Sequence, residues 1–342
     1  METCAPWQPG DPSASPTTDI DQARSDLREF GYCIVEDVLG GSELAALRTR
    51  LVEQAEAEIE IGVAFEDQGP GQDWSNRHRH SRENVFTAAN GGINQRLWML
   101  VNKGAVFRNL VTDQRLSPLV ESLLGPEFVL SSLTANIAKP GGRAMGLHTD
   151  QWWLPRPLPR HDEPHVPGAM QRGEFHGADD GDMTRPINPP CAANVVYCLN
   201  DFTEANGATR LVPTSHLTGL QPPPGIPCPV PTLPAEAGAG SAIVWDGRIW
   251  HGTGANQSGE HRLAVLATFC GPQFRPQENY TLGVDPDLLV DAPRELLDRL
   301  GFRIWNAYGR VGHPYVQNAN PEAQLVGELA PKRLQLKRVA AR

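Results

Sequence analysis

The stretch SAIVWDGRIWHGTGANQSGEHRLAVLATFC, residues 241–270, decides the fold class. It contains two apolar runs with β-branched residues, and a polar turn rich in Gly, Asn and Ser separates them. Comparable short runs precede it as FVLSSLTANIAKPGG at 128–142, ANVVYCLND at 193–201 and TRLVPTSH at 209–216. Several short strands separated by turn residues are typical of an all-β sandwich or barrel.

Helical patterns come before this β region. Residues 19–30, DIDQARSDLREF, predict a capped amphipathic helix, and the following GYCIVEDVL, residues 31–39, predicts a strand. A second helix is expected after Ser42, which would cap it. Two shorter helices are expected at Val101–Thr112 and Ser117–Leu124. The chain is therefore predicted to be mainly β with flanking helices.

A single domain is the favoured organisation, because the β region needs the N-terminal helices to cover one of its sheets. We expect residues 1–18, which are polar and proline-rich, to be disordered and residues 19–342 to form the domain. Residues 154–190, dense in Pro, His, Arg and Asp, lie between two predicted strands. A connection of this length is either disordered or functional, and we predict a lid-like insertion.

The charge and cysteine content limit the classes of partner. The 342-residue chain has 30 Lys and Arg against 40 Asp and Glu, a net charge of −10, which disfavours nucleic acid and anionic membranes. The six cysteines are scattered without a CxxC pair, and we find neither a signal peptide nor an apolar run of about 18 residues. We expect a cytoplasmic protein, monomeric or homodimeric, that acts on a small molecule.

Two metal-ligating side chains, His148 and Asp150, stand one residue apart in GLHTDQWWLP, residues 146–155. In an extended segment, residues i and i+2 share a face, so both could reach one ion. Alone, this HxD triplet is equally a polar strand end. His251 follows an apolar run, precedes small residues and supplies a third ligand. Because two histidines and one carboxylate are typical of non-haem iron(II) oxygenases, we predict a metal site at these three residues.

Arg262 adds to this prediction. If the segment folds as a symmetric hairpin, His251 and Arg262 stand directly opposite one another and project into the same interior. A buried arginine is costly without a carboxylate partner, and this face of the hairpin supplies none. A bound carboxylate ligand would meet that need.

With these residues the chain resembles the phytanoyl-CoA dioxygenase family of iron(II)- and 2-oxoglutarate-dependent oxygenases. The resemblance is carried by LREFGYCIVEDVLGGSELAALR at 27–48, HTD at 148–150, LNDFTEANGATRLVPTSH at 199–216 and WDGRIWHGTGANQSGEHR at 245–262. It implies a double-stranded β-helix core, a cupin-like jelly roll, decorated by N-terminal helices.

The resemblance also implies a cofactor and two cosubstrates. Carried onto this sequence, it implies that His148, Asp150 and His251 hold iron(II), with 2-oxoglutarate and O2 as cosubstrates. It implies that Arg262 pairs with the distal carboxylate of 2-oxoglutarate, because a guanidinium can bind a carboxylate through two hydrogen bonds. Thr253 would support the same carboxylate.

Four further side chains are candidates for the site. Asn136 and Asn194 lie on predicted inner strands, where they either bind the cosubstrate or belong to a structural hydrogen-bond network. Trp152 and Trp153 follow the HxD pair directly and would line the substrate pocket, although only one of two adjacent strand residues can face it. The alternative is that both rings belong to the core.

The predicted activity is that of a 2-oxoglutarate-dependent dioxygenase that hydroxylates an unactivated C–H bond of a small molecule, in specialised natural-product metabolism. The carboxylate of Asp150 disfavours halogenation, because related halogenases replace it with a small residue. The alternatives are an acyl-CoA or lipid hydroxylase of the same family, a cupin-type metal enzyme that does not use 2-oxoglutarate, and a binding protein on the same fold.

Overall fold

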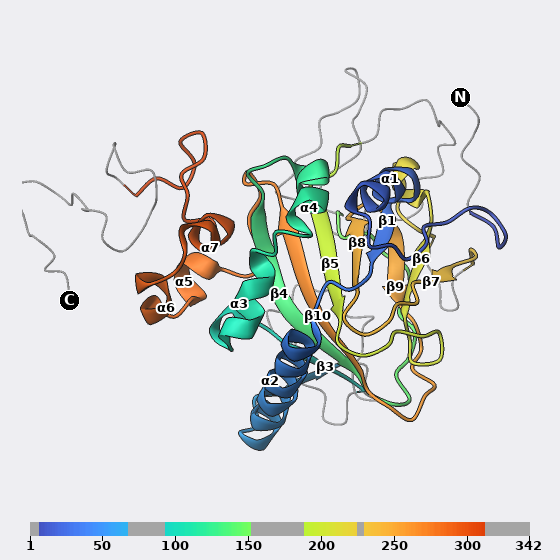
Figure 1. Ribbon diagram of the computed structural model, residues 1–342, viewed down its shortest axis with the longest axis horizontal. Coiled ribbons are helices and arrows are strands. Elements are labelled where there is room, and N and C mark those ends of the chain that lie inside the picture. The colour runs from blue at the N-terminus through green and yellow to red at the C-terminus, as the bar shows by residue number, and fades with distance from the viewer. Residues whose placement is uncertain (1–6, 68–92, 152–187, 224–228, 312–342) are drawn as a thin grey trace, which may run out of the picture.

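Two antiparallel sheets form the centre of the molecule. The computed structural model describes residues 7–67, 93–151, 188–223 and 229–311 (Figure 1). The large sheet has the strand order β1-β8-β5-β10-β4-β3-β2, and the small sheet has the order β7-β6-β9. The strands are β1 Tyr32–Val35, β2 Phe65–Asp67, β3 Asn94–Leu97, β4 Val129–Ala138, β5 Ala192–Cys198, β6 Thr209–Val212, β7 Leu233–Pro234, β8 Ala242–Asp246, β9 Trp250–Thr253 and β10 Arg262–Cys270.

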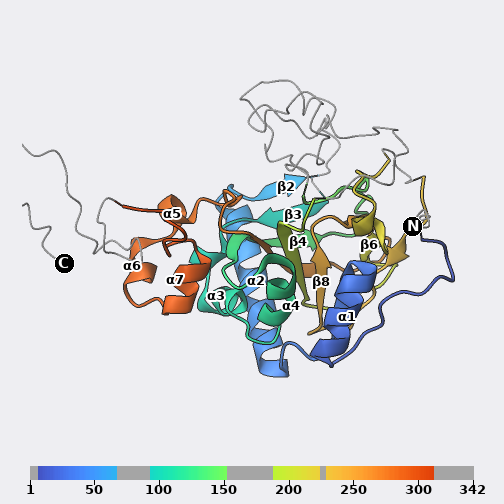
Figure 2. The ribbon, with the colours of Figure 1, turned by 90° about the horizontal axis from the view of Figure 1, so that it is seen from above.

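Helices cover one side of the large sheet, as Figure 2 shows for α1 to α4. The helices are α1 Ile20–Phe30, α2 Gly41–Glu60, α3 Ala105–Val111, α4 Ser117–Leu124, α5 Tyr280–Gly283, α6 Pro286–Val290 and α7 Arg294–Arg299, with short 3-10 turns at Leu100–Asn102 and Ser215–Leu217. The positions of α1 and α4 follow the sequence prediction closely. The expected helix at Val101–Thr112 is instead a 3-10 turn followed by α3.

The period-two alternation of β10 divides the buried side chains into two cores. Val265 and Ala267 face outward and pack in one cluster with residues of the covering helices. Ala264 and Leu266 face inward and pack with residues of the small sheet, including Leu211. Since successive side chains of a strand point to opposite faces, Arg262 and Thr268 share the inner face with Ala264.

Helix α1 is fixed at both ends by the residues that its sequence provides. The Asp19 carboxylate accepts hydrogen bonds from the backbone N–H groups of Asp21 and Gln22, a cap that contributes about 1 kcal/mol. Gly31 ends the helix at φ 83°, and a Cβ there would lie 2.5 Å from His216 Nδ1. Glycine is therefore required at this position both for its backbone conformation and for the close approach of the imidazole ring.

Helix α2 begins differently from the prediction. Its N-cap is Gly40, and no side chain caps it, so the capping role predicted for Ser42 is wrong. The helix depends on burial instead, because Leu47 and Leu51 are fully buried in the core cluster that the helices share with the large sheet. Each such leucine contributes about 2 kcal/mol.

The predicted hairpin between His251 and Arg262 is also wrong. Strand β9 pairs with β6 in the small sheet, whereas β10 lies between β4 and β5 in the large sheet. The turn that joins them crosses from one sheet to the other, and the Asn256 side chain holds it by donating to the backbone oxygens of Ala138 and Glu260. Both side chains still face the interior, now from opposite sheets.

Residues 7–18 differ from the disorder that the sequence predicts for 1–18. Trp7 and Ala14 are buried, and Thr17 forms a parallel bridge with Val35 of β1. Trp7 packs with Leu147 and other apolar residues beside the small sheet. Residues 1–6 lie outside the described ranges.

The C-terminal helices α5 to α7 pack at one end of the large sheet (Figure 1). Glu278 joins these helices to the large sheet. Its carboxylate accepts hydrogen bonds from the Met99 N–H at 2.6 Å, the Leu133 N–H at 2.9 Å and the Tyr280 hydroxyl at 2.6 Å. Burial raises the pKa of Glu278, and these three donors oppose that shift.

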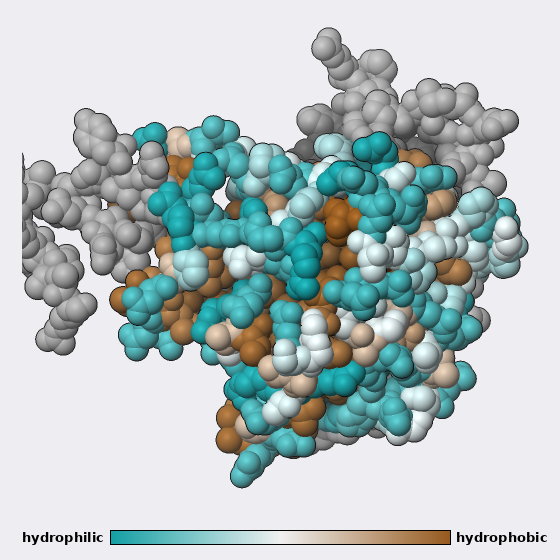
Figure 3. Space-filling model, viewed as in Figure 1, coloured by the Kyte–Doolittle hydropathy of each residue, from teal (hydrophilic) through white to brown (hydrophobic). Residues whose placement is uncertain are grey.

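The surface seen in Figure 3 is largely hydrophilic, and apolar side chains reach it over the C-terminal helices. Leu282 and Val290 of this region are exposed. Single exposed apolar side chains are normal for a folded protein. In the described ranges, no helix combines the length and the apolar character needed to cross a membrane.

We expect Glu278→Ala to lower the free energy of unfolding by about 2–4 kcal/mol, because buried donors lose their acceptor. Urea unfolding followed by circular dichroism measures this loss. The control is Glu260→Ala, which removes an exposed carboxylate from the β9–β10 turn and should change stability little. Equal losses in the two variants would contradict the role of Glu278.

Candidate metal centre

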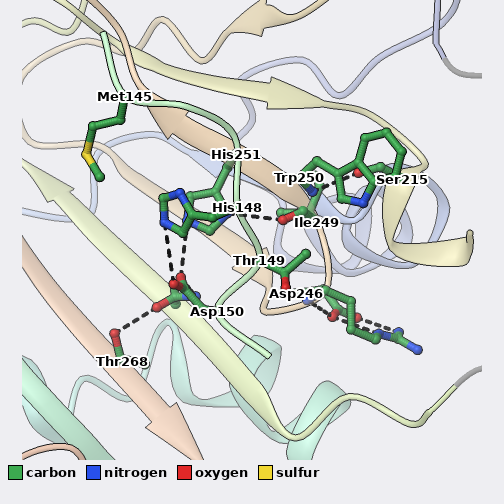
Figure 4. Close-up of polar contacts among 12 residues, drawn as sticks. Met145, His148, Thr149, Asp150, Ser215, Asp246, Ile249, Trp250, His251 and Thr268 are labelled. Atoms are coloured by element: carbon green, nitrogen blue, oxygen red, sulfur yellow. Dashed lines mark hydrogen bonds and ion pairs between the residues drawn. The ribbon is translucent and has the colours of Figure 1, made fainter. Parts of the chain in front are cut away.

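One potential ligand atom from each of His148, Asp150 and His251 lies within 4.8 Å of the other two (Figure 4). His251 belongs to β9, and His148 forms an antiparallel bridge with it. The His148 N–H donates to the His251 oxygen at 2.9 Å, and the His251 N–H donates to the His148 oxygen at 3.0 Å. This backbone pairing brings together residues that are about a hundred positions apart in the sequence.

Backbone carbonyls orient both imidazole rings. His148 Nδ1 lies 3.3 Å from the Gly146 oxygen, and His251 Nδ1 lies 3.1 Å from the Ile249 oxygen. Because a carbonyl only accepts, an Nδ1–H donated to it would leave Nε2 as the nitrogen that can bind a metal. The Nε2 atoms face Asp150, at 3.7 Å from Oδ1 for His148 and 3.1 Å from Oδ2 for His251.

Asp150 is held through its backbone and its carboxylate. Its N–H donates to the Gly247 oxygen at 2.9 Å. The side-chain amide of Asn194 on β5 donates to Asp150 Oδ2 at 2.9 Å, and the Thr268 hydroxyl on β10 donates to Asn194 Oδ1 at 2.7 Å. The structure therefore places Asn194 in contact with Asp150. Thr268, which sequence reasoning missed, is the next member of the chain of hydrogen bonds.

Other residues that sequence reasoning missed support His251. The Trp245 ring lies 5.0 Å from the His251 ring, centroid to centroid. Ser215 Oγ accepts from the Trp250 N–H at 2.8 Å and donates to the Val212 oxygen at 2.6 Å, which fixes the start of β9. The PTSH motif at 213–216 was the signal that could have identified Ser215.

The turn before β9 contains an ion pair between Asp246 and the partly exposed Arg248. The fully buried Asp246 carboxylate accepts from Arg248 Nε at 2.9 Å and from its Nη2 at 2.5 Å. Arg248 also donates to the Asn188 oxygen at 3.0 Å, which joins this turn to the segment that precedes β5.

Arg262 lies inside the same interior and has 2% of its surface exposed. It donates to the Gly207 oxygen, its guanidinium carbon lies 5.1 Å from the Phe202 ring centroid, and its Nε–H is buried without a partner. Burial lowers the pKa of Arg262 to about 10, and the nearby positive charge of Arg96 adds to this effect. Among the described residues, no carboxylate pairs with Arg262.

Two more predicted residues lie on the walls of this interior. Asn136 faces Ala264 across the β4–β10 pair and is buried, and its Oδ1 has no hydrogen-bond partner. Thr253 lies two residues after His251 on β9 and so shares its face.

The remaining predicted site residues lie outside the described ranges. These are Trp152 and Trp153, together with all of the predicted lid at 154–190 except 188–190. Gln151, the last described residue before that gap, is buried. Its side chain donates to the Pro189 oxygen at 2.7 Å and accepts from the Cys191 N–H at 2.8 Å, so the two borders of the gap are tied together.

A model of the family Phytanoyl-CoA dioxygenase (PhyH) matches residues 27–264 of this chain. The chain belongs to the phytanoyl-CoA dioxygenase family. Similar proteins include Dioxygenase af480 of Aspergillus fumigatus. It is 27% identical over 277 residues, which cover 80% of this chain and 74% of the relative. Dioxygenase ALT11 of Alternaria alternata is 25% identical over 84% of each chain.

Solved structures share the fold of this phytanoyl-CoA dioxygenase family member. The epimerase SnoN, in complex with Fe3+, alpha ketoglutarate and nogalamycin RO, aligns with a TM-score of 0.50 at 18% identity, over 78% of this chain and 90% of that one. HygX from Streptomyces hygroscopicus, with nickel, 2-oxoglutarate and hygromycin B bound, aligns with a TM-score of 0.50 at 15% identity, over 75% and 88%. The predicted β class with a jelly-roll core is confirmed.

Metal binding at the three clustered side chains should stabilise the folded state. At a free Co(II) concentration about 100 times the dissociation constant, the free energy of unfolding should rise by about 2.7 kcal/mol. His251→Ala should lose this increase, because it removes one of three ligands. Anaerobic urea unfolding of each variant, with and without metal, measures it.

His261→Ala is the matched control, because it removes an exposed histidine from the turn after β9. It should keep the full metal-dependent increase. A metal-dependent increase that survives in His251→Ala would show that the ion binds elsewhere.

Proposed function

We propose that this protein is an iron(II)- and 2-oxoglutarate-dependent dioxygenase that hydroxylates a C–H bond of a small molecule. The observation that carries the proposal is the combination of the three clustered ligands with an arginine, buried in the same interior, that has no carboxylate partner among the described residues. Neither feature alone selects this chemistry. Together, the three ligands would hold a metal and the arginine would hold a dicarboxylate beside it.

The donor set fits iron(II). The Nε2 atoms of His148 and His251 and one carboxylate oxygen of Asp150 would hold the ion, and a triad of this type leaves coordination positions open for other ligands. When bound, iron supplies the activation of O2, for which amino-acid side chains have no equivalent. The two backbone carbonyls that hold Nδ1 keep each ring in the metal-binding tautomer.

Arg262 fits the distal carboxylate of 2-oxoglutarate. Its buried Nε–H lacks an acceptor, and a buried cation without a counter-charge is costly. A carboxylate would remove this cost and accept two parallel hydrogen bonds from the guanidinium. Thr253 and Asn136 lie on the same inner faces and are proposed to contact the cosubstrate.

Burial differs across the site and suggests the direction of substrate entry. Arg262 and the His251 side chain are 2% and 7% exposed, whereas the His148 and Asp150 side chains are 23% and 28% exposed. We place 2-oxoglutarate at the buried end and the substrate at the His148–Asp150 end. Trp152 and Trp153 follow that end in the chain and are proposed to line the substrate pocket, beneath a lid at 154–190. A dry interior around the reacting atoms limits side reactions.

The substrate is proposed to be a small molecule of specialised metabolism. The fold neighbours support this class, because one is described with nogalamycin RO and another with hygromycin B. The related carbocyclase SnoK is assigned to nogalamycin biosynthesis. Hydroxylation is the proposed outcome, and the carboxylate of Asp150 argues against halogenation, since it occupies the position that a halide would need.

Arg262→Lys tests the cosubstrate directly. A lysine keeps the charge but cannot form two parallel hydrogen bonds, so the dissociation constant for 2-oxoglutarate should rise on the order of 10–100-fold. Anaerobic titration of the iron(II)-loaded protein, followed by its visible absorption, measures this constant. The control is Arg210→Lys, on strand β6, where the arginine pairs with Glu204 and Thr232.

Three outcomes separate the possibilities. Binding of 2-oxoglutarate, with succinate released when a substrate is supplied, is the expected result. Metal binding without 2-oxoglutarate binding would favour a cupin-type enzyme that does not use this cosubstrate. Absence of metal binding in the folded protein would favour a binding protein.

A further inference from the structure

We propose that Thr268 and Asn194 form a hydrogen-bond relay that sets the orientation of the Asp150 carboxylate and thereby the affinity of the metal site. Asn194 is then a positioning residue and not a ligand of the cosubstrate. This inference depends on the proposed function, because it assumes that Asp150 binds the metal.

The relay has one consistent direction. An ionised carboxylate only accepts hydrogen bonds, so the Asn194 group that lies 2.9 Å from Asp150 Oδ2 must be its NH2. The amide oxygen then faces Thr268 and accepts its hydroxyl hydrogen at 2.7 Å. If the amide were reversed, two oxygens would meet at Asp150. The Thr268 hydroxyl therefore fixes the orientation of the amide that Asp150 requires.

The relay starts from a rigid part of the molecule. Thr268 and Asn194 are directly paired on β10 and β5, two central strands of the large sheet, and their side chains share its inner face. Asn194 is buried with 3% of its surface exposed, whereas the Asp150 side chain is 28% exposed. In Figure 4, Thr268 lies across Asp150 from the two histidines. The relay thus ties the more exposed ligand to the large sheet.

The relay also makes the two carboxylate oxygens of Asp150 unequal. Oδ2 receives the Asn194 N–H, and this hydrogen bond restricts the rotation of the carboxylate about its last bond. An oxygen that is already hydrogen-bonded is a poorer second ligand, so the metal is expected to take one oxygen of Asp150. Single-oxygen binding keeps coordination positions open for the cosubstrates.

A role in cosubstrate binding fits Asn194 less well. Both of its polar side-chain atoms already have partners inside the protein. Asn136, by contrast, has a buried Oδ1 without one, which makes it the better candidate for a cosubstrate contact.

Thr268→Val tests the relay, because valine keeps the shape of threonine and removes its hydroxyl. Loss of a hydrogen bond that orients a metal ligand weakens metal binding on the order of 10–100-fold. We expect the dissociation constant for Co(II) to rise by that factor, with a changed visible spectrum of the bound ion. Thr268→Ser, which restores the hydroxyl, should recover most of the affinity.

Thr149→Val is the matched control. Thr149 stands between the two ligands, is buried, and donates its hydroxyl hydrogen to Gln221 Oε1 at 2.8 Å, away from Asp150. This variant loses a comparable hydrogen bond and should leave the Co(II) constant unchanged. Asn194→Leu is a second test of the relay and should weaken metal binding at least as much as Thr268→Val.

The outcomes distinguish the relay from the proposed function. If the wild-type protein binds Co(II) and Thr268→Val binds it equally well, the relay is overturned and the proposed function stands. If Thr149→Val weakens binding as much as Thr268→Val does, the effect is general loss of structure, and the relay is overturned. If the wild-type protein binds no metal through the triad, both fail together.

Discussion

The backbone pairing between His148 and His251 is the interaction on which the candidate site depends. Two hydrogen bonds hold the HxD segment against β9, and they set the imidazole rings 4.4 Å apart, centroid to centroid. Glycine on β9 favours this close approach. A Cβ at Gly252 would lie 3.1 Å from the Met145 oxygen and 3.2 Å from the Gly146 oxygen. Any other residue at this position would therefore push against the segment that leads to His148.

The two sheets contribute different parts of the site. The small sheet and the segment paired with it position the histidines, whereas the large sheet provides Arg262 and Asn194, which contacts Asp150. A metal ion and a buried guanidinium in one interior form a strongly positive region. Such a region favours an anionic molecule between them. The positive charge of this interior therefore selects for an anionic ligand.

Sequence reasoning reached the elements whose signals are local. The N-terminal cap of α1, the strand runs of β4, β5 and β10, and the HxD pair follow from residue types at short spacing. His251 was identified by its place after an apolar run. Sequence reasoning failed where long-range contacts determine how the strands pair. The turn after His251 could close a hairpin or cross between sheets, and the crossing depends on long-range contacts such as the docking of Asn256 against Ala138. Asn194 was identified as an inner-face residue, but its contact with Asp150 depends on that same packing. Thr268 carries no sequence signal at all.

The central claim is that His148, Asp150 and His251 together hold iron in a site that Arg262 completes for a dicarboxylate. Anomalous diffraction at the iron edge, from crystals grown anaerobically with iron(II) and 2-oxoglutarate, tests it most directly. The account predicts one anomalous peak within bonding distance of the two Nε2 atoms and an Asp150 oxygen, with a dicarboxylate extending from it to Arg262. A peak away from these side chains, or a dicarboxylate that does not contact Arg262, would contradict it.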